Sequence, residues 1–180
     1  MNIRTPRLLL RTPERADAAR LSLLAGDYDV ACMTGSIPHP IASNKPPNGS
    51  RACLQAEEGV VFAILRSGVV IGCTGYRAFG ADHAELGYWI GKPYWGMGYG
   101  TEAVEALVAH AFGADGFDYL TASHFADNPA SERVLKKPRL RRLGQRRARL
   151  RGAQRQNTMR DLPPRPRRGA CRAPHSLVQR

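Results

Sequence analysis

The chain has 180 residues, of which 43% are hydrophobic and 23% charged, so it has the length of one domain and a globular composition that excludes disorder throughout. It contains no apolar run of about 18 residues, which excludes a membrane-spanning helix, and the apolar run at 8–10 is too short for a signal peptide, so we expect a cytoplasmic protein without a membrane partner. The formal net charge of +12 is unevenly distributed, because residues 138–180 hold 14 arginines and one acidic residue while residues 1–137 are nearly neutral.

The hydrophobic patterns alternate between strands and helices around one sheet, which predicts a mixed α/β domain. Proline at the first helical position and glycine just after the last turn mark the helix ends, and two β-rich runs around a short glycine-containing turn predict a hairpin. In chain order we expect a strand (3–12), a helix (12–26), a loop (34–50), a β-hairpin (60–65 and 69–76), a strand (84–91), a glycine-rich loop (93–100), a helix (101–112), a strand (119–125) and a short helix (129–137).

The most informative segment is the glycine-rich loop, because it follows a strand and opens a helix. Glycines let the backbone turn tightly and approach a ligand closely, and the free N–H groups at a helix start attract anions. The loop therefore predicts a phosphate or pyrophosphate site at residues 96–101, although a glycine turn without a ligand is the alternative. A P-loop is disfavoured because no lysine precedes Thr101, and a dinucleotide-binding fold is disfavoured because the loop follows a hairpin late in the chain.

Five segments within residues 3–137 form one ordered set: TPRLLLR (5–11), IGCTG (71–75), AELGYWI (84–90), PYWGMGYGTEA (93–103) and NPAS (128–131). In this order they resemble the GNAT superfamily of N-acetyltransferases, and within it the RimJ/RimL-type branch of ribosomal-protein-alanine acetyltransferases. Gly98 and Gly100 match the two small positions of the family's pyrophosphate motif, while Trp95 stands where glutamine or arginine is usual.

The resemblance implies a central mixed sheet flanked by helices and transfer of an acetyl group from acetyl-CoA to an amine, without a metal. The acceptor would be a protein N-terminus or a small-molecule amine, and the chain would be a monomer or a homodimer. The implied cofactor contacts are the strand that binds the pantetheine arm (Tyr88, Trp89 and Ile90), the pyrophosphate loop (Gly96, Met97, Gly98, Tyr99, Gly100 and Thr101) and Asn128.

The resemblance also implies two catalytic residues. Glu85 lies where several relatives keep a glutamate that removes a proton from the amine, since an ammonium cannot attack a thioester; a charged residue on an exposed strand face is the alternative. Ser131 lies where a hydroxyl would donate a proton to the departing thiolate. Asn128 either contacts the ligand or serves only as the N-cap of the short helix.

After Lys137 the family pattern would continue with Leu-Gly-Phe and two further strands, but no later segment has a strand pattern. We therefore expect a C-terminally incomplete domain over 1–137 and a basic tail over 138–180. Three interpretations remain open: an arm that binds nucleic acid or the ribosome, a disordered tail without a specific role, and a shifted reading frame near residue 137. The basic arm defines the alternative function, a nucleic-acid-binding protein.

The cysteines give no indication of a metal site or a disulfide framework. The chain has four of them, and none is in a CxxC pair or in another metal-ligand spacing. Free thiols in a reducing compartment are the expected state.

Overall fold

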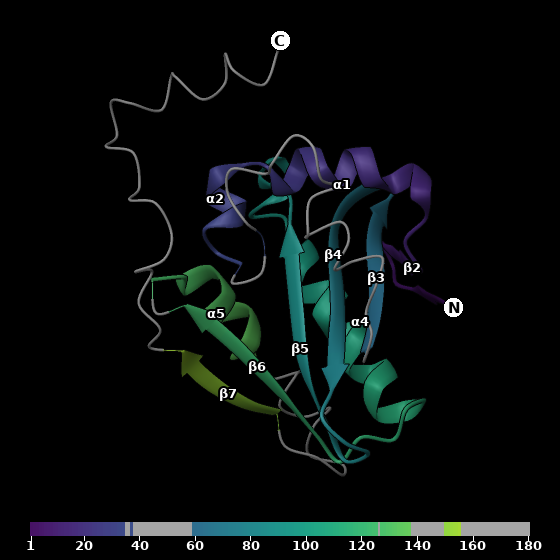
Figure 1. Ribbon diagram of the computed structural model, residues 1–180, viewed down its shortest axis with the longest axis vertical. Helices are drawn as coiled ribbons and strands as arrows, with labels where there is room; N and C mark the ends of the chain where they lie inside the picture. The colour runs from purple at the N-terminus through teal and green to yellow at the C-terminus, as the bar shows by residue number, and fades with distance from the viewer. Residues whose placement is uncertain (35–36, 38–58, 126, 138–149, 156–180) are drawn as a thin grey trace.

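A seven-stranded mixed sheet with helices on both faces makes up the computed structural model, which describes residues 1–34, 37, 59–125, 127–137 and the backbone of 150–155 (Figure 1). The strands follow the order β1-β2-β3-β4-β5-β6-β7, and all neighbours are antiparallel except the parallel pairs β5–β6 and β6–β7. This confirms the predicted mixed fold. The strands are β1 (Asn2–Arg4), β2 (Leu9–Arg11), β3 (Gly59–Arg66), β4 (Val69–Ala78), β5 (His83–Ile90), β6 (Tyr119–Phe125) and β7 (Leu150–Arg155).

The helices connect these strands and cover the sheet. The helix between the parallel strands β5 and β6 and the helix that follows β6 both border the candidate site. The helical elements are η1 (Arg15–Asp17), α1 (Ala18–Ala25), α2 (Tyr28–Ala31), η2 (Lys92–Tyr94), α4 (Tyr99–Gly113) and α5 (Pro129–Leu135), η1 and η2 being short 3-10 helices.

The predicted hairpin forms the centre of the sheet as β3 and β4. Val60 pairs with Tyr76, and the two-residue turn between the strands is made by Ser67 and Gly68, both with positive φ. A two-residue turn with positive φ at both positions matches the right-handed twist of the flanking strands. The hairpin prediction is therefore confirmed.

The N-terminal prediction of one strand over 3–12 is wrong, because the structure has two short strands there. The backbone N–H of Thr5 donates to the carbonyl of Leu8 across 2.9 Å, which closes a turn between β1 and β2. Pro6 lies inside that turn, and a proline cannot donate to a strand ladder. The first helix also begins later than predicted, at η1 rather than at Pro13, because Glu14 and Asp17 form a capping box there.

The main core lies between the sheet and α4, the helix behind the sheet in Figure 1. The residues of α4 that the helical spacing assigned to its apolar face are all fully buried, which confirms that prediction. They are Ala103, Val104, Leu107, Val108 and Ala111. The opposite face of the sheet packs against α1 through a smaller cluster that includes Leu21 and Val70.

The arginine-rich segment contains a strand that the sequence did not predict. β7 pairs in parallel with β6 from Leu120 opposite Leu150 to Phe125 opposite Arg155. The expectation that no segment after Lys137 is a strand is therefore corrected, and β6 has a neighbouring strand on each side. The physical reason is that strand pairing satisfies backbone N–H and C=O groups and does not require β-branched side chains. Residues 138–149 and 156–180, on which the other expectations for the tail fall, lie outside the described residues.

Two further expectations concern the whole chain. Cys32 and Cys73 are buried and in the thiol form, while Cys53 and Cys171 lie outside the described residues. Within the described part of the chain, no helix has the length and apolar character that crossing a membrane requires.

Candidate active site

A gap between β5 and β6 forms the centre of the candidate site. The two strands pair only from His83–Leu86 to Tyr119–Ala122, and beyond these residues they diverge (Figure 1). A cavity of about 1360 Å³ lies at the divergence and extends to the start of α4 and of α5. Backbone groups of diverging strands are not used by the sheet, so the gap can accept an extended ligand.

The glycine-rich loop closes one end of the cavity. Gly96 and Gly98 have φ of 76° and 79°, which places both in the left-handed region that favours glycine. Gly98 is the N-cap of α4 and no side chain caps the helix. The first helical hydrogen bond runs from the N–H of Glu102 to the carbonyl of Gly98, so the N–H groups of the first turn lack helical partners, and they lie at the positive end of the helix dipole.

At position 100 the requirement for glycine comes from side-chain packing and not from the backbone conformation. A Cβ at this position would lie 3.1 Å from Cε2 of Tyr88, which is closer than ordinary van der Waals contact. The ring of Tyr88 therefore packs directly on the first turn of α4. This contact connects the loop to β5.

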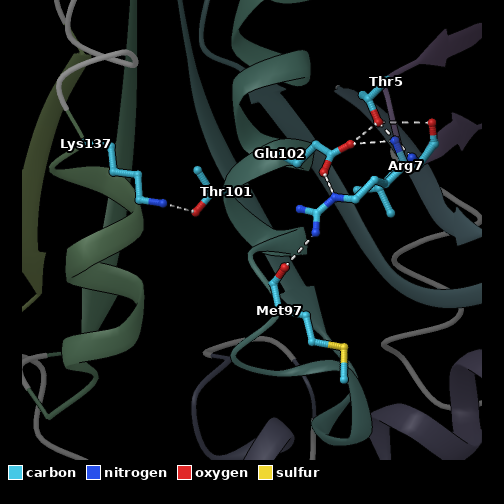
Figure 2. Close-up of polar contacts among 7 residues, drawn as sticks. Thr5, Arg7, Met97, Thr101, Glu102 and Lys137 are labelled. Carbon is cyan, nitrogen blue, oxygen red and sulfur yellow. Dashed lines mark hydrogen bonds and ion pairs between the residues drawn. The ribbon is translucent and has the colours of Figure 1, made fainter.

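Two cationic side chains approach the same turn from distant parts of the chain (Figure 2). The Lys137 ammonium donates to the hydroxyl of Thr101 across 3.0 Å, and the Arg7 guanidinium donates to the carbonyl of Met97 across 3.0 Å. Arg7 also pairs with the carboxylate of Glu102, with Nε and Oε2 2.6 Å apart. The loop thus has positive charge on both sides.

Glu102 is the one carboxylate among the first-turn residues of α4. Burial alone would raise its pKa, but hydrogen bonds from the Thr5 hydroxyl, the Arg7 backbone N–H and the Arg7 guanidinium outweigh burial and hold the pKa below its ordinary value. Glu102 is therefore ionised at neutral pH.

A hydroxyl pair lies on the α5 side of the gap. The phenol of Tyr88 donates to Oγ of Ser131 across 3.2 Å. Burial is the main influence on Tyr88 and raises the pKa of its phenol, so the phenol stays protonated. The Asn128 side chain accepts from the Ser131 backbone N–H across 3.0 Å. This is the N-cap role that the sequence analysis left open for Asn128, and the atom that fills it is the amide oxygen.

The carboxylate of Glu85 lies on the face of the sheet opposite to the Tyr88 ring, near the point where β5 and β6 separate. Glu85 accepts a hydrogen bond of 2.8 Å from the hydroxyl of Ser123 on β6. Glu85 shares its face of β5 with Trp89, which packs against the clusters beneath α1 and α2. Both side chains line the cavity, together with Asp29 of α2.

Trp95 occupies a structural position in the loop. Its indole N–H donates to the carbonyl of Ile90 across 2.6 Å, which joins the loop to the end of β5. The backbone carbonyl of Ile90, one of the residues that the resemblance implies for the pantetheine arm, therefore accepts a hydrogen bond within the chain.

Eleven of the twelve residues predicted for the site line this one cavity. The exception is Met97, whose side chain is exposed and whose carbonyl faces Arg7. Sequence reasoning did not identify Arg7, Ser123 or Lys137, since each reaches the site through a contact between distant segments. The TPR sequence at 5–7 was the one available signal for Arg7. Among the described residues no group of three or more His, Cys, Asp or Glu side chains is arranged to hold a metal.

Comparison with known proteins gives one family. Residues 7–141 match the family model described as an acetyltransferase (GNAT) domain. An uncharacterized N-acetyltransferase of Bacillus subtilis (strain 168), YoaA, is 34% identical over 90 residues, which cover 48% of this chain and 51% of that protein. The match thus spans about half the length of this curated relative.

Solved structures share the fold. A GNAT-family acetyltransferase from Bacillus anthracis superimposes with a TM-score of 0.63 and 23% identity, covering 78% of this chain and 82% of that one. Mycobacterium smegmatis RimJ, solved with a CoA-disulfide, superimposes with a TM-score of 0.61 and 22% identity, covering 75% of this chain and 71% of that one.

Proposed function

The chain belongs to the GNAT acetyltransferase family, and from this premise we propose that it transfers the acetyl group of acetyl-CoA to a primary amine. The observation that carries the proposal is the position of the glycine-rich loop at the end of the gap between β5 and β6, within one cavity. Such a cavity suits a long ligand with an anionic middle and a reactive thioester at its end.

The loop fits the pyrophosphate of coenzyme A. The first-turn N–H groups of α4 have no helical partners, and Lys137 places an ammonium beside Thr101. Backbone N–H groups and a helix N-terminus are a common site for phosphate. Gly96 and Gly98 keep this surface free of side chains, and Gly96 has open space around the position of a Cβ. In this proposal the pantetheine arm lies along residues 88–90 of β5.

Glu85 has the position of a general base. Attack requires a neutral amine, so a carboxylate that removes the proton of the ammonium, directly or through one water, promotes the reaction. Ser123 donates to Oε1 of Glu85 and thereby orients the carboxylate. In the transfer Glu85 removes one proton from the ammonium, and the neutral amine nitrogen then forms a bond to the acetyl carbon as the carbon–sulfur bond breaks. The second nitrogen proton leaves to solvent, from which the Ser131 hydroxyl regains the proton that it gives to the sulfur.

Ser131 has the position of a proton donor to the departing thiolate. Its oxygen accepts a hydrogen bond from Tyr88, which leaves the proton of the Ser131 hydroxyl available to another acceptor. Donation to the sulfur as the carbon–sulfur bond breaks stabilises the developing negative charge. Glu85 lies on β5 and Ser131 on α5, and both line the same cavity.

The acceptor in this proposal is a primary amine on a protein N-terminus or on a small molecule, as in the RimJ/RimL-type branch. Support for the branch comes from the sequence motifs and from the fold shared with RimJ. The carboxylate of Glu85 lines the cavity on the α2 side, and its negative charge favours a cationic amine over an acidic acceptor.

Isothermal titration with acetyl-CoA tests the proposal. The wild-type chain should bind, and Gly98→Glu should not, because it forces a side chain into a left-handed backbone and adds a negative charge beside the pyrophosphate. Gly113→Glu is the matched control, since Gly113 ends the same helix in open space. A screen of amine acceptors with a thiol-release readout then identifies the acceptor class. A folded wild-type chain that does not bind acetyl-CoA would contradict the proposal.

A further inference from the structure

The N-terminal segment 5–7 lies against the first turn of α4, although it is 95 residues away in the sequence (Figure 2). The Thr5 hydroxyl donates to Oε1 of Glu102 across 2.7 Å and accepts from the N–H of Leu8. The backbone N–H of Arg7 donates to the same oxygen across 2.9 Å. These contacts hold the segment and the carboxylate in one arrangement.

The Arg7 guanidinium joins two parts of the loop at once. Its Nε donates to Oε2 of Glu102 across 2.6 Å, and Nη1 donates to the carbonyl of Met97 across 3.0 Å. Its Cζ also lies 4.8 Å from the ring centre of Tyr99. A planar guanidinium offers several donors in fixed directions, so it can bridge two acceptors in a way that an ammonium cannot.

The contact with Met97 affects the direction of the loop backbone. A carbonyl that faces Arg7 does not face the anion site, which removes a negative dipole from that site. The same contact fixes the peptide that precedes Gly98, the residue that starts α4. Nη2 of Arg7 lies 3.4 Å from the position that a Cβ on Gly98 would take. The guanidinium is thus in direct contact with the loop.

The contact with Glu102 affects the electrostatics of the site. An ionised carboxylate in the first turn of a helix is stabilised by the helix dipole, but it repels an anionic ligand bound at the same helix end. The side chain of Glu102 is only 15% exposed, so water screens its charge weakly. The positive charge of Arg7, in direct contact, cancels most of this repulsion.

We propose that Arg7 is a positioning residue for the pyrophosphate of acetyl-CoA: it orients the Met97 carbonyl away from the site and neutralises Glu102. This inference rests on the proposed function. It gives the TPR sequence at 5–7 a role in cofactor binding, through the loop rather than by contact with the reacting atoms.

The test compares two ligands by isothermal titration of the full chain. Acetyl-CoA contains the pyrophosphate, whereas S-acetylpantetheine contains the thioester and the pantetheine arm without it. Arg7→Gln should weaken acetyl-CoA binding about tenfold, the size expected for loss of a hydrogen bond to a charged group, and should change S-acetylpantetheine binding by less than about twofold. Adding Glu102→Gln to Arg7→Gln should restore part of the acetyl-CoA affinity, because the unpaired carboxylate is then absent.

Arg11→Gln is the matched control. Arg11 is also an N-terminal arginine paired with a carboxylate, that of Asp17, but its contacts are with η1 and not with the loop. It should leave the binding of both ligands unchanged. If Arg7→Gln does not fold, Arg7→Lys replaces it in the test. The positive charge remains, but one ammonium cannot bridge the Glu102 carboxylate and the Met97 carbonyl, so we expect an intermediate loss of affinity for acetyl-CoA alone.

Equal losses for the two ligands, or acetyl-CoA binding by Arg7→Gln or Arg7→Lys that matches wild type, would overturn the inference. Absence of acetyl-CoA binding by the wild-type chain is a separate result, because it contradicts the proposed function itself.

Discussion

The phenol of Tyr88 donates a hydrogen bond to the hydroxyl of Ser131, and this bond joins β5 to the first turn of α5 across the gap that forms the site. The ring of Tyr88 also packs on Gly100 at the start of α4. One side chain therefore contacts both the loop proposed for the pyrophosphate and the hydroxyl proposed for the thiolate. It sets their separation along the cavity.

Tyr88→Phe should lower kcat about tenfold and leave the KM for acetyl-CoA nearly unchanged. The ring and its packing remain, but Ser131 loses the donor that orients its proton toward the sulfur, a loss of about one hydrogen bond. The loss should shrink with a thioester whose thiol is more acidic, since such a leaving group needs less help. Tyr76→Phe, which removes the phenol that donates to the carboxylate of Asp115, an exposed residue, is the control and should not alter this leaving-group dependence. An equal response of the two variants would contradict the prediction.

Glu85→Gln should lower kcat by about 10²-fold or more, because an amide cannot remove the proton of the attacking amine. The defect should diminish at high pH, where more of the acceptor amine is already neutral. Ser123→Ala should give a smaller loss, since it removes only the hydrogen bond that orients Glu85. Rates over a range of pH check both variants. Glu105→Gln on α4 is the matched control, and a pH-independent defect in Glu85→Gln would argue against the base role.

Lys137→Gln should weaken acetyl-CoA binding by about two- to fivefold, the effect of one exposed charge near a helix end. The loss should be largest at low ionic strength because salt screens exposed charges. Lys136→Gln is the control: its ammonium pairs with Glu132 on α5 and not with the loop. Titrations at two salt concentrations distinguish them, and similar behaviour of the two lysines would contradict a role for the Lys137–Thr101 contact.

Asp17→Asn should lower the free energy of unfolding at neutral pH by about 1–3 kcal/mol, because Asp17 accepts from both guanidinium nitrogens of Arg11. Burial would raise the pKa of Asp17, but the hydrogen bonds from Arg11 and from the Glu14 backbone hold the pKa below its ordinary value of 3.8. A lowered folded-state pKa contributes stability that is complete above the unfolded pKa and is lost as pH falls below it. Urea unfolding at pH 7 and at pH 3 should therefore show a larger difference between wild type and Asp17→Asn at pH 7.

The nucleotide sequence around codons 135–140 should show whether the reading frame shifts there. Arginine, proline, alanine and glycine make up 26 of residues 138–180, and the motif pattern stops at Lys137 within four residues of the end of the family match. If the frame shifts, another frame should encode a Leu-Gly-Phe-like start and two alternating strands. Restoring it should raise the melting temperature, because more apolar surface around Val134 and Leu135 is then buried, at roughly 25 cal/mol per Å². Absence of a strand pattern in both alternative frames would favour a genuine basic arm.

The sequence by itself determined the elements whose signals are local. Alternation and a glycine turn defined the β3–β4 hairpin, helical spacing defined the buried face of α4, and glycines between a strand and a helix located the loop. These signals work because each depends on the backbone preferences of neighbouring residues. The family motifs added the residues around Glu85 and Ser131, which the cavity brings together.

Only the tertiary structure decided which distant segments meet. The Arg7–Glu102 pair joins residues 95 apart, and the Tyr88–Ser131 bond joins residues 43 apart. Local periodicity contains no information on such contacts, because it assigns a residue to a face but not to a partner. The pairing of β7 with β6 was missed for the same reason. The strand is favoured by the backbone groups of β6 that need hydrogen-bond partners, and the side chains of the arginine-rich segment give no signal for it.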